Sequence, residues 1–133
     1  MPAIAQVLAA QLPIKDTSEH KLLAAMQWQA LTSLTEWQSI LAASETTTQV
    51  VFKHSTRCSI SSMALSRLER SAQPSNATFH LLDLIKHRDV SNAIAEDLQV
   101  YHESPQVIVI KDRTCVYDES HMAIQMDEII TQL

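Results

Sequence analysis

The sequence predicts a single α/β domain in which helices flank a mixed β-sheet, in the order βαβαβα followed by ββα. Two observations support this fold class. Short apolar, β-branched runs, which are typical of buried strands, alternate with segments whose apolar residues recur at helical spacing. Such alternation implies parallel strands joined by helical crossovers. Near the C-terminus two strand patterns follow one another directly, which indicates a hairpin and an antiparallel portion of the sheet.

The composition is that of an ordinary globular domain. The chain has 133 residues, of which 46% are hydrophobic and 19% charged, and a chain of this length buries about two-thirds of its unfolded surface. A net charge of −5 without a basic stripe argues against a nucleic-acid or membrane partner. No apolar run is long enough to span a bilayer, and no basic segment precedes the apolar part of the N-terminus, so we expect a cytoplasmic protein. We expect residues 1–25 to be an N-terminal extension of a domain at 26–133.

The first strand and the first helix of this domain are expected before residue 45. Residues 26–32, MQWQALT, alternate apolar and polar side chains as a half-buried strand does. Ser33 and Glu36 have the spacing of a capping box, which predicts a helix to about Ser44. The inner face of the strand would hold Met26, Trp28 and Ala30, and that of the helix Trp37, Ile40 and Leu41.

The next strand and helix surround the first cysteine. Residues 49–53 have the composition of a buried strand, and the helical spacing that follows predicts a helix from about Cys58 to Ser71. Ser55 and Thr56, in the turn between them, carry side chains that can accept hydrogen bonds from free amides at a helix start. The inner face of this helix is expected to hold Ile60, Met63, Ala64 and Leu68.

Five further elements complete the domain. A turn at residues 74–76 leads to a strand at 78–84 and a helix at 88–98. Strands at 106–110 and 114–117 form the hairpin. The inner face of the 88–98 helix is expected to hold Val90, Ala93, Ile94 and Leu98. A closing helix is expected to place Met122, Met126, Ile129, Ile130 and Leu133 on one face.

The chain contains no glycine. Any left-handed backbone must therefore come from other residues, and Asn76 and Asp112 are the best candidates because asparagine and aspartate tolerate this conformation. The order of elements as a whole is the architecture of a thioredoxin-like domain.

Cys58 is the first candidate functional residue. A thiol at a helix start meets unpaired amide groups and the positive end of the helix dipole, and the adjacent Arg57 adds a second positive charge. Such surroundings can lower a thiol pKa from about 8.5 to about 3.5–7.5. The alternative is that Cys58 is a small buried hydrophobic residue. The two cysteines have no metal-binding spacing, so no metal site is expected.

Several segments resemble the monothiol bacilliredoxins of the YtxJ type. They are FKHSTRCSIS at 52–61, SNAIAEDL at 91–98, HESPQ at 102–106 and SH at 120–121. Members of this family are small thioredoxin-fold proteins that resemble glutaredoxins but serve bacillithiol, which they remove from mixed disulfides on cytosolic proteins. The resemblance implies S-thiolated proteins as partners and a bacillithiol-like thiol as cosubstrate, with no bound cofactor. The family usually has proline after the cysteine, where this chain has Ser59.

The resemblance assigns Cys58 as the nucleophile that attacks a substrate disulfide. A dithiol enzyme would carry its second cysteine three positions later, but this chain has Ser61 there, so a monothiol mechanism follows. Ser61 and its neighbour Ser62 either bond the thiolate or satisfy amides at the helix start. As alternative functions, an iron–sulfur carrier that uses Cys58 and an external thiol, or a binding module without a reactive cysteine, would suit the same fold.

The resemblance also implies a substrate-binding proline. Pro105, before the strand at 106–110, would form a cis peptide bond with Ser104 and face the active cysteine, leaving the backbone of the preceding residue free to pair with an extended substrate. Ser120 and His121 either contact the polar part of a small thiol or simply begin the last helix. His54 and Lys53, close to Cys58, are expected to be solvated rather than to tune the thiol. Cys115, beyond the hairpin turn, is expected to lie too far from the active end for a disulfide.

Overall fold

The computed structural model describes residues 25–133, so the expected extension lies almost entirely outside the described residues. The elements are β1 (Gln29–Ala30), α3 (Leu34–Ala43), β2 (Thr48–His54), α4 (Ser59–Glu69), β3 (Ala77–Asp83), α5 (Arg88–Leu98), β4 (Gln106–Lys111), β5 (Thr114–Ser120), the 3-10 helix η1 (His121–Ala123) and α6 (Met126–Ile130). Their order confirms the predicted βαβαβα and ββα sequence of elements. In the described part of the chain, no helix is long and apolar enough to cross a membrane.

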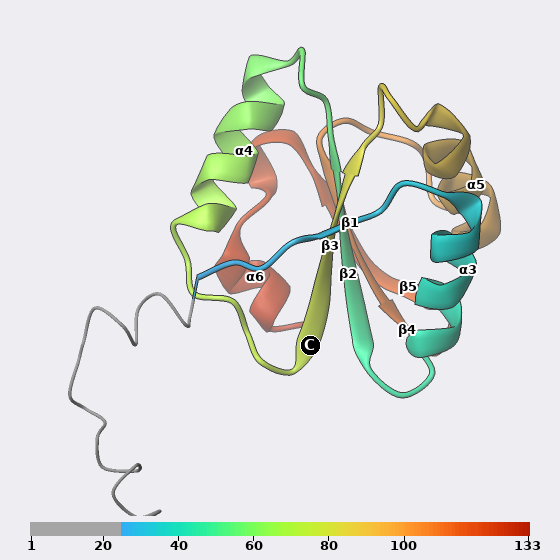
Figure 1. Ribbon diagram of the computed structural model, residues 1–133. Coiled ribbons are helices and arrows are strands. Elements are labelled where there is room, and N and C mark those ends of the chain that lie inside the picture. The colour runs from blue at the N-terminus through green and yellow to red at the C-terminus, as the bar shows by residue number, and fades with distance from the viewer. Residues whose placement is uncertain (1–24) are drawn as a thin grey trace, which may run out of the picture.

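The elements form three layers around a five-stranded sheet of order β1-β3-β2-β4-β5. Strands β1, β3 and β2 are parallel, while β4 is antiparallel to both β2 and β5, so the sheet is mixed as predicted. Figure 1 shows α4 and α6 on one face of the sheet and α3 and α5 on the other. Because β2 lies in the middle of the sheet, the residues that follow its C-terminal end sit near the centre of that edge.

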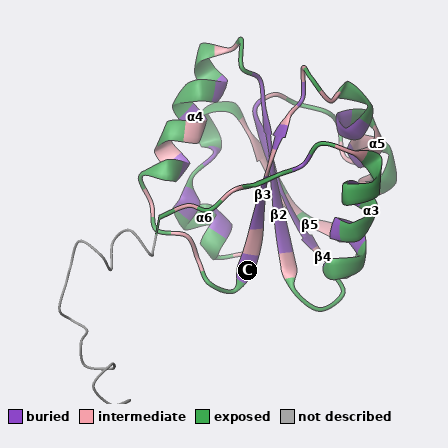
Figure 2. Cartoon of the chain, in the orientation of Figure 1, coloured by how far each residue is buried: buried purple, intermediate pink, exposed green. Residues whose placement is uncertain are grey.

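Each face of the sheet has its own hydrophobic core. Phe52 and Phe79 belong to the core under α4 and α6, while Trp37 and Ile108 belong to the core under α3 and α5. Figure 2 shows the central strands buried along most of their length. Strand residues with period-two alternation therefore contribute to both cores, as expected for a sheet covered on both sides.

Helix α3 begins as the capping box predicts. The Ser33 hydroxyl accepts a hydrogen bond from Glu36 N at 3.1 Å. The Glu36 carboxylate accepts hydrogen bonds from Thr32 N at 2.7 Å and from the Thr32 hydroxyl at 3.0 Å. Trp37, Ile40 and Leu41 are buried, which confirms the predicted inner face of this helix.

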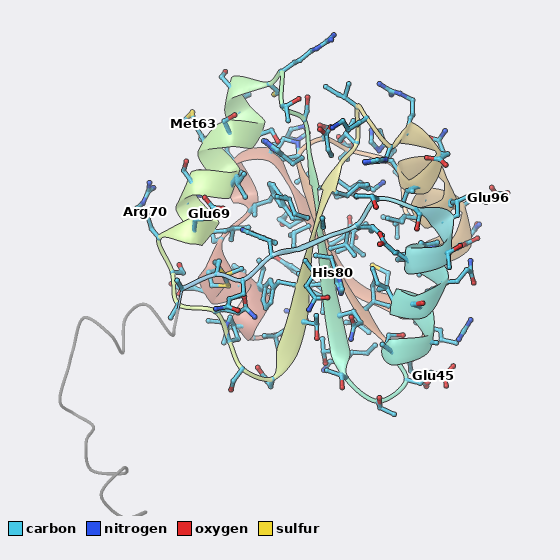
Figure 3. All side chains as sticks on the ribbon, in the orientation of Figure 1. Glu45, Met63, Glu69, Arg70, His80 and Glu96 are labelled. Atoms are coloured by element: carbon cyan, nitrogen blue, oxygen red, sulfur yellow. The ribbon has the colours of Figure 1, made fainter. Side chains whose placement is uncertain are left out.

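The predicted inner face of α4 is partly wrong. Ile60 is 39% exposed and Met63 52% exposed, whereas Ser61 is fully buried together with Ala64 and Leu68. Figure 3 shows the Met63 side chain on the outer side of α4, away from the sheet. The inner face is rotated because a serine occupies a core-facing position, which hydrophobic spacing alone does not reveal.

Two terminal elements also differ from expectation. Strand β1 has only two residues; of its predicted inner face, Met26 and Trp28 pack against the core under α4 and α6, whereas Ala30 is exposed. Leu31, which follows the strand, is buried in the other core. The predicted closing helix is interrupted: Ile124 and Gln125 are extended between η1 and α6. The break buries Ile124 and leaves Met122 and Ile130 exposed, so the predicted single apolar face is wrong.

Left-handed backbone occurs at Gln99, Asp112, Arg113 and His121. Asp112 confirms the prediction, whereas Asn76 is not among these residues. Asp112 and Arg113 form the two-residue turn of the β4–β5 hairpin, where positive φ at both positions matches the twist of the strands. Gln99 ends α5 at a position that glycine usually fills.

Candidate functional site

Cys58 lies directly beyond the central strand. It occupies the N-cap position of α4, and the preceding turn is closed by a 3.2 Å hydrogen bond from Cys58 N to Ser55 O. No side chain caps the first amides of this helix, and its first turn contains no acidic residue. The half-buried thiol thus sits beside unpaired N–H groups at the positive end of the helix dipole, which suits an anion.

The turn residues around Cys58 differ in exposure and in role. Arg57 and Thr56 are exposed, and within residues 25–133 the Arg57 guanidinium makes no ion pair or hydrogen bond. Arg57 is thus a neighbour of Cys58 in the chain, but no hydrogen bond or ion pair within the described residues holds its guanidinium against the thiol. Neither Ser55 nor Thr56 caps the helix, because the N-cap is Cys58 itself, and this confirms the predicted place of Cys58 at the helix start.

Ser61 lies one helical turn after Cys58 and is fully buried. Its Oγ accepts a 2.9 Å hydrogen bond from Ser55 N and lies 2.7 Å from His54 Nδ1. His54 stacks on Phe52, and burial lowers the pKa of its imidazole. Ser61 therefore bonds the turn before the helix, which is neither of the two partners considered for it, the thiolate and the amides of the helix start.

The structure brings the four other candidate residues to the same edge. The Ser104–Pro105 peptide bond is cis. Gln106, the residue after Pro105, is paired with Lys53 of β2, so Pro105 lies at the sheet end from which Cys58 departs. His121 N donates to Pro105 O at 3.1 Å, and Ser120 ends β5 opposite Gln106. His121 Nε2 also lies 3.7 Å from Glu103 Oε1.

Lys53 and His54 are buried, so the expectation of solvated side chains is wrong for both. Lys53 is 0% exposed; its Nζ donates to Ser91 O at 3.2 Å and lies 3.2 Å from His102 Nδ1. Burial lowers the pKa of Lys53 to about 8. These positions were mispredicted because a lysine and a histidine in a turn-adjacent segment normally mark a solvated end of a strand.

Sequence reasoning missed Gln106 and His102. Gln106 is fully buried at the start of β4, ahead of the apolar residues 107–110, and His102 covers Lys53 from the loop before it. The available signal was a lysine and a glutamine within two runs predicted as buried strands, since buried polar residues need partners.

Cys115 lies at the other end of the sheet. It pairs with Ile110, which in turn pairs with Gln49 near the start of β2, whereas Cys58 follows the end of β2. Burial raises the pKa of the Cys115 thiol, and its Sγ bonds Tyr117 O. The expected separation of the two cysteines is confirmed.

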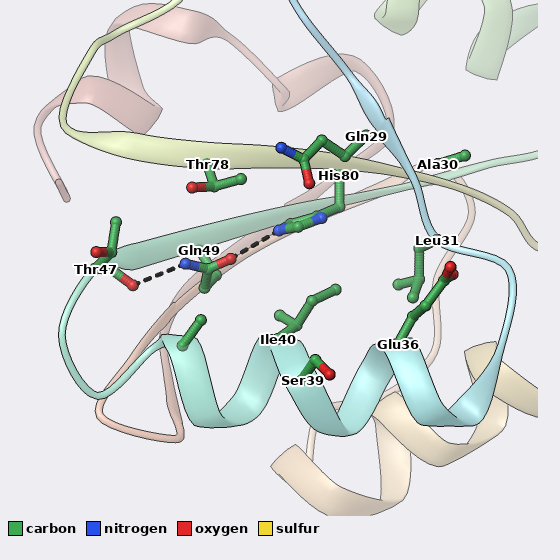
Figure 4. Close-up of a pocket in the computed structure, with 11 residues that line it drawn as sticks. Gln29, Ala30, Leu31, Glu36, Ser39, Ile40, Thr47, Gln49, Thr78 and His80 are labelled. Carbon is green, nitrogen blue, oxygen red and sulfur yellow. Dashed lines mark hydrogen bonds between the residues drawn. The ribbon is translucent and has the colours of Figure 1, made fainter.

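A cavity of about 430 Å³ lies on the α3 face, also remote from Cys58. Figure 4 shows His80 and Gln49 on its sheet side and Glu36 and Ser39 on α3. His80 Nε2 lies 2.7 Å from Gln49 Oε1, and burial lowers the pKa of His80 to about 4.

Among residues 25–133, no group of three or more His, Cys, Asp or Glu side chains is placed to hold a metal ion.

Solved structures share this fold. A chain described provisionally as an oxidoreductase with a thioredoxin fold is 25% identical with a TM-score of 0.68; the match covers 77% of this chain and 90% of that chain. Mitochondrial thioredoxin 3 from Saccharomyces cerevisiae is 20% identical with a TM-score of 0.63, covering 80% and 95%. The thioredoxin of Malassezia sympodialis is 14% identical with a TM-score of 0.66, covering 80% and 90%.

The family comparison agrees with the fold. The protein-family model described as monothiol bacilliredoxin BrxC matches residues 29–129 of this chain, which include every candidate residue named above. Together with the oxidoreductase-like structures, this match supports a thiol redox function. The chain belongs to the monothiol bacilliredoxin family.

Proposed function

We propose that this protein is a monothiol thiol–disulfide oxidoreductase that removes a bacillithiol-like small thiol from mixed disulfides on cytosolic proteins. The observation that carries the proposal is the pairing of a half-buried cysteine at the N-cap of α4 with a serine three positions later. The helix start favours a thiolate, and the serine removes the intramolecular resolving step.

The reaction has two exchange steps. The Cys58 thiolate attacks the small-thiol sulfur of the mixed disulfide, forming a new disulfide with Cys58 and releasing the protein thiolate, which takes a proton from solvent. A second small thiol, as its thiolate, then attacks the small-thiol sulfur of that disulfide. This step releases the oxidised small-thiol dimer and restores the Cys58 thiolate.

The surrounding residues have two proposed roles. Arg57 contributes positive charge beside the thiolate, and the buried Ser61 fixes the turn that presents it. The backbone of Ser104, which precedes the cis Pro105, would pair with the protein substrate. Ser120 and His121 lie beside this bond, where His121 N donates to Pro105 O, and they would contact the small thiol.

Intact-mass analysis tests the proposal directly. The reduced protein is incubated separately with oxidised bacillithiol and with oxidised glutathione, alongside Cys58→Ser and Cys115→Ser variants. We expect one bacillithiol adduct, retained in Cys115→Ser and lost in Cys58→Ser. Equal modification of Cys58→Ser, or no adduct from either reagent, would overturn the proposal.

Alkylation adds an independent check of which thiol reacts. Iodoacetamide at neutral pH should modify Cys58 before Cys115, because burial and Asp118 raise the pKa of Cys115 and leave its thiol protonated. Peptide mapping over time gives both rates. If Cys115 reacts first, the assignment of the nucleophile is wrong.

A further inference from the structure

The loop formed by residues 99–105, which carries the cis proline, is held by two buried polar side chains. Lys53 contacts His102 of this loop and the carbonyl of Ser91 in α5. Gln106 is the register partner of Lys53 across the β2–β4 pair. Because directly opposed residues of an antiparallel pair project to the same face, the two side chains leave the sheet together.

The side-chain amide of Gln106 bonds two backbone groups of the loop and one carboxylate of β5. Its Oε1 accepts from Glu103 N at 3.2 Å, and its Nε2 donates to Tyr101 O at 3.0 Å and to Asp118 Oδ2 at 3.3 Å. With His102 held by Lys53, three successive residues of the loop are bound to the sheet beneath them. Ser104 and Pro105 follow immediately.

The lysine is the unusual member of this pair. Its side chain is fully buried, and within residues 25–133 it forms no ion pair with a carboxylate. A buried ammonium without a carboxylate is unfavourable for stability, and an apolar side chain of similar length would fit such a site at lower free energy. A role other than stability would explain a lysine at this position.

We propose that Lys53 and Gln106 are positioning residues that hold the 99–105 loop so that the backbone beside Pro105 pairs in a fixed register with the protein part of a mixed disulfide. This inference rests on the proposed function and extends it to the protein substrate. A small disulfide makes no strand pairing, so its reaction with Cys58 depends less on this loop. Lys53 and Gln106 therefore matter more for the reaction with protein disulfides than for the reaction with small disulfides.

Variants Lys53→Met, Gln106→Met and His102→Ala test the proposal, with Lys111→Met at the far end of β4 as the matched control. Rates are measured with an S-bacillithiolated protein and with bis(2-hydroxyethyl) disulfide. For the first three variants, kcat/KM for the protein should fall about tenfold further than for the small disulfide, mainly through KM; tenfold corresponds to about one hydrogen bond. Lys111→Met should leave kcat/KM unchanged for both the thiolated protein and the small disulfide.

Amide hydrogen exchange supplies a readout that does not depend on activity. Exchange at Tyr101, His102 and Glu103 should accelerate in Lys53→Met and Gln106→Met while β2 and β4 stay protected. If wild type does not act on the thiolated protein, the proposed function fails, and the exchange result alone decides whether the two residues hold the loop. Equal losses for both substrates, or unchanged loop exchange, would overturn the positioning role. His102→Ala keeps the test decisive if a buried variant does not fold, because His102 is exposed.

Discussion

Ser61 Oγ and His54 Nδ1 lie 2.7 Å apart inside the protein. Ser61 is one helical turn after Cys58, and His54 ends the strand before it. The same Ser61 oxygen accepts from Ser55 N. A hydroxyl has one proton to donate and two lone pairs, so it can accept from the amide while it donates to a neutral imidazole. The position at which a dithiol enzyme carries its resolving thiol is thus occupied by a fully bonded hydroxyl that joins α4 to the turn before it.

Replacing Ser61 by alanine should destabilise the protein. The change leaves Ser55 N and His54 Nδ1 unpaired in a buried site, for which we expect a loss of about 1–3 kcal/mol in the free energy of unfolding. Urea denaturation at pH 7 measures it. The matched control is Ser62→Ala, because Ser62 is exposed and should change stability by less than about 0.5 kcal/mol. Equal effects of the two variants would contradict the importance of this contact.

Replacing Ser61 by cysteine should convert the site to dithiol chemistry. Two cysteines separated by two residues at a helix start are the arrangement of disulfide oxidoreductases. After treatment with a small disulfide, we expect the variant to lose the small-thiol adduct and form an internal disulfide with Cys58. Intact mass distinguishes the two products. The comparison with Ser62→Cys, whose side chain faces solvent, shows whether position rather than an added thiol is responsible; a persistent adduct in Ser61→Cys would count against a resolving geometry.

Lys53→Met should increase stability at pH 7 although it impairs the loop. The folded pKa of Lys53 is about 8, below the ordinary value of about 10.4, so the unfolded state binds more protons between these values. Stability of the wild type should therefore rise as pH increases from about 8 to 10, by up to roughly 3 kcal/mol. Urea unfolding across this range should show the rise in wild type and in Lys111→Met, but not in Lys53→Met.

Most of the fold was predictable because its elements follow simple periodic patterns. The capping box at Ser33 and the apolar runs of β2 and β4 identified their elements correctly. The errors occur where polar residues face inward, as Ser61 does, or where the backbone leaves its regular path, as at Ile124. Periodicity counts apolar residues, so it misplaces a helix face that includes a bonded serine.

The position of the candidate thiol at a helix start was predictable, but the residues around it were not. Cys58 stands at a change of period that is visible in the sequence, and the cis proline followed from the family resemblance. Lys53 and Gln106 acquire their meaning only from the register that places them opposite each other. Such a pairing joins residues far apart in the chain, and no local pattern specifies it.

His80 should make the protein sensitive to acid. Burial lowers its pKa to about 4 in the folded state, against about 6.5 when unfolded, so the unfolded state binds more protons between these values. The stability contributed by neutral His80 is complete above pH 6.5 and is lost as pH falls toward 4, amounting to at most roughly 3 kcal/mol. In His80→Gln, which can still bond Gln49, the free energy of unfolding should fall less between pH 7 and pH 4.5 than in wild type.

His87→Gln, at the partly exposed start of α5, is the control and should follow wild type. Parallel pH profiles for wild type and His80→Gln would show that the burial of this imidazole does not govern acid stability.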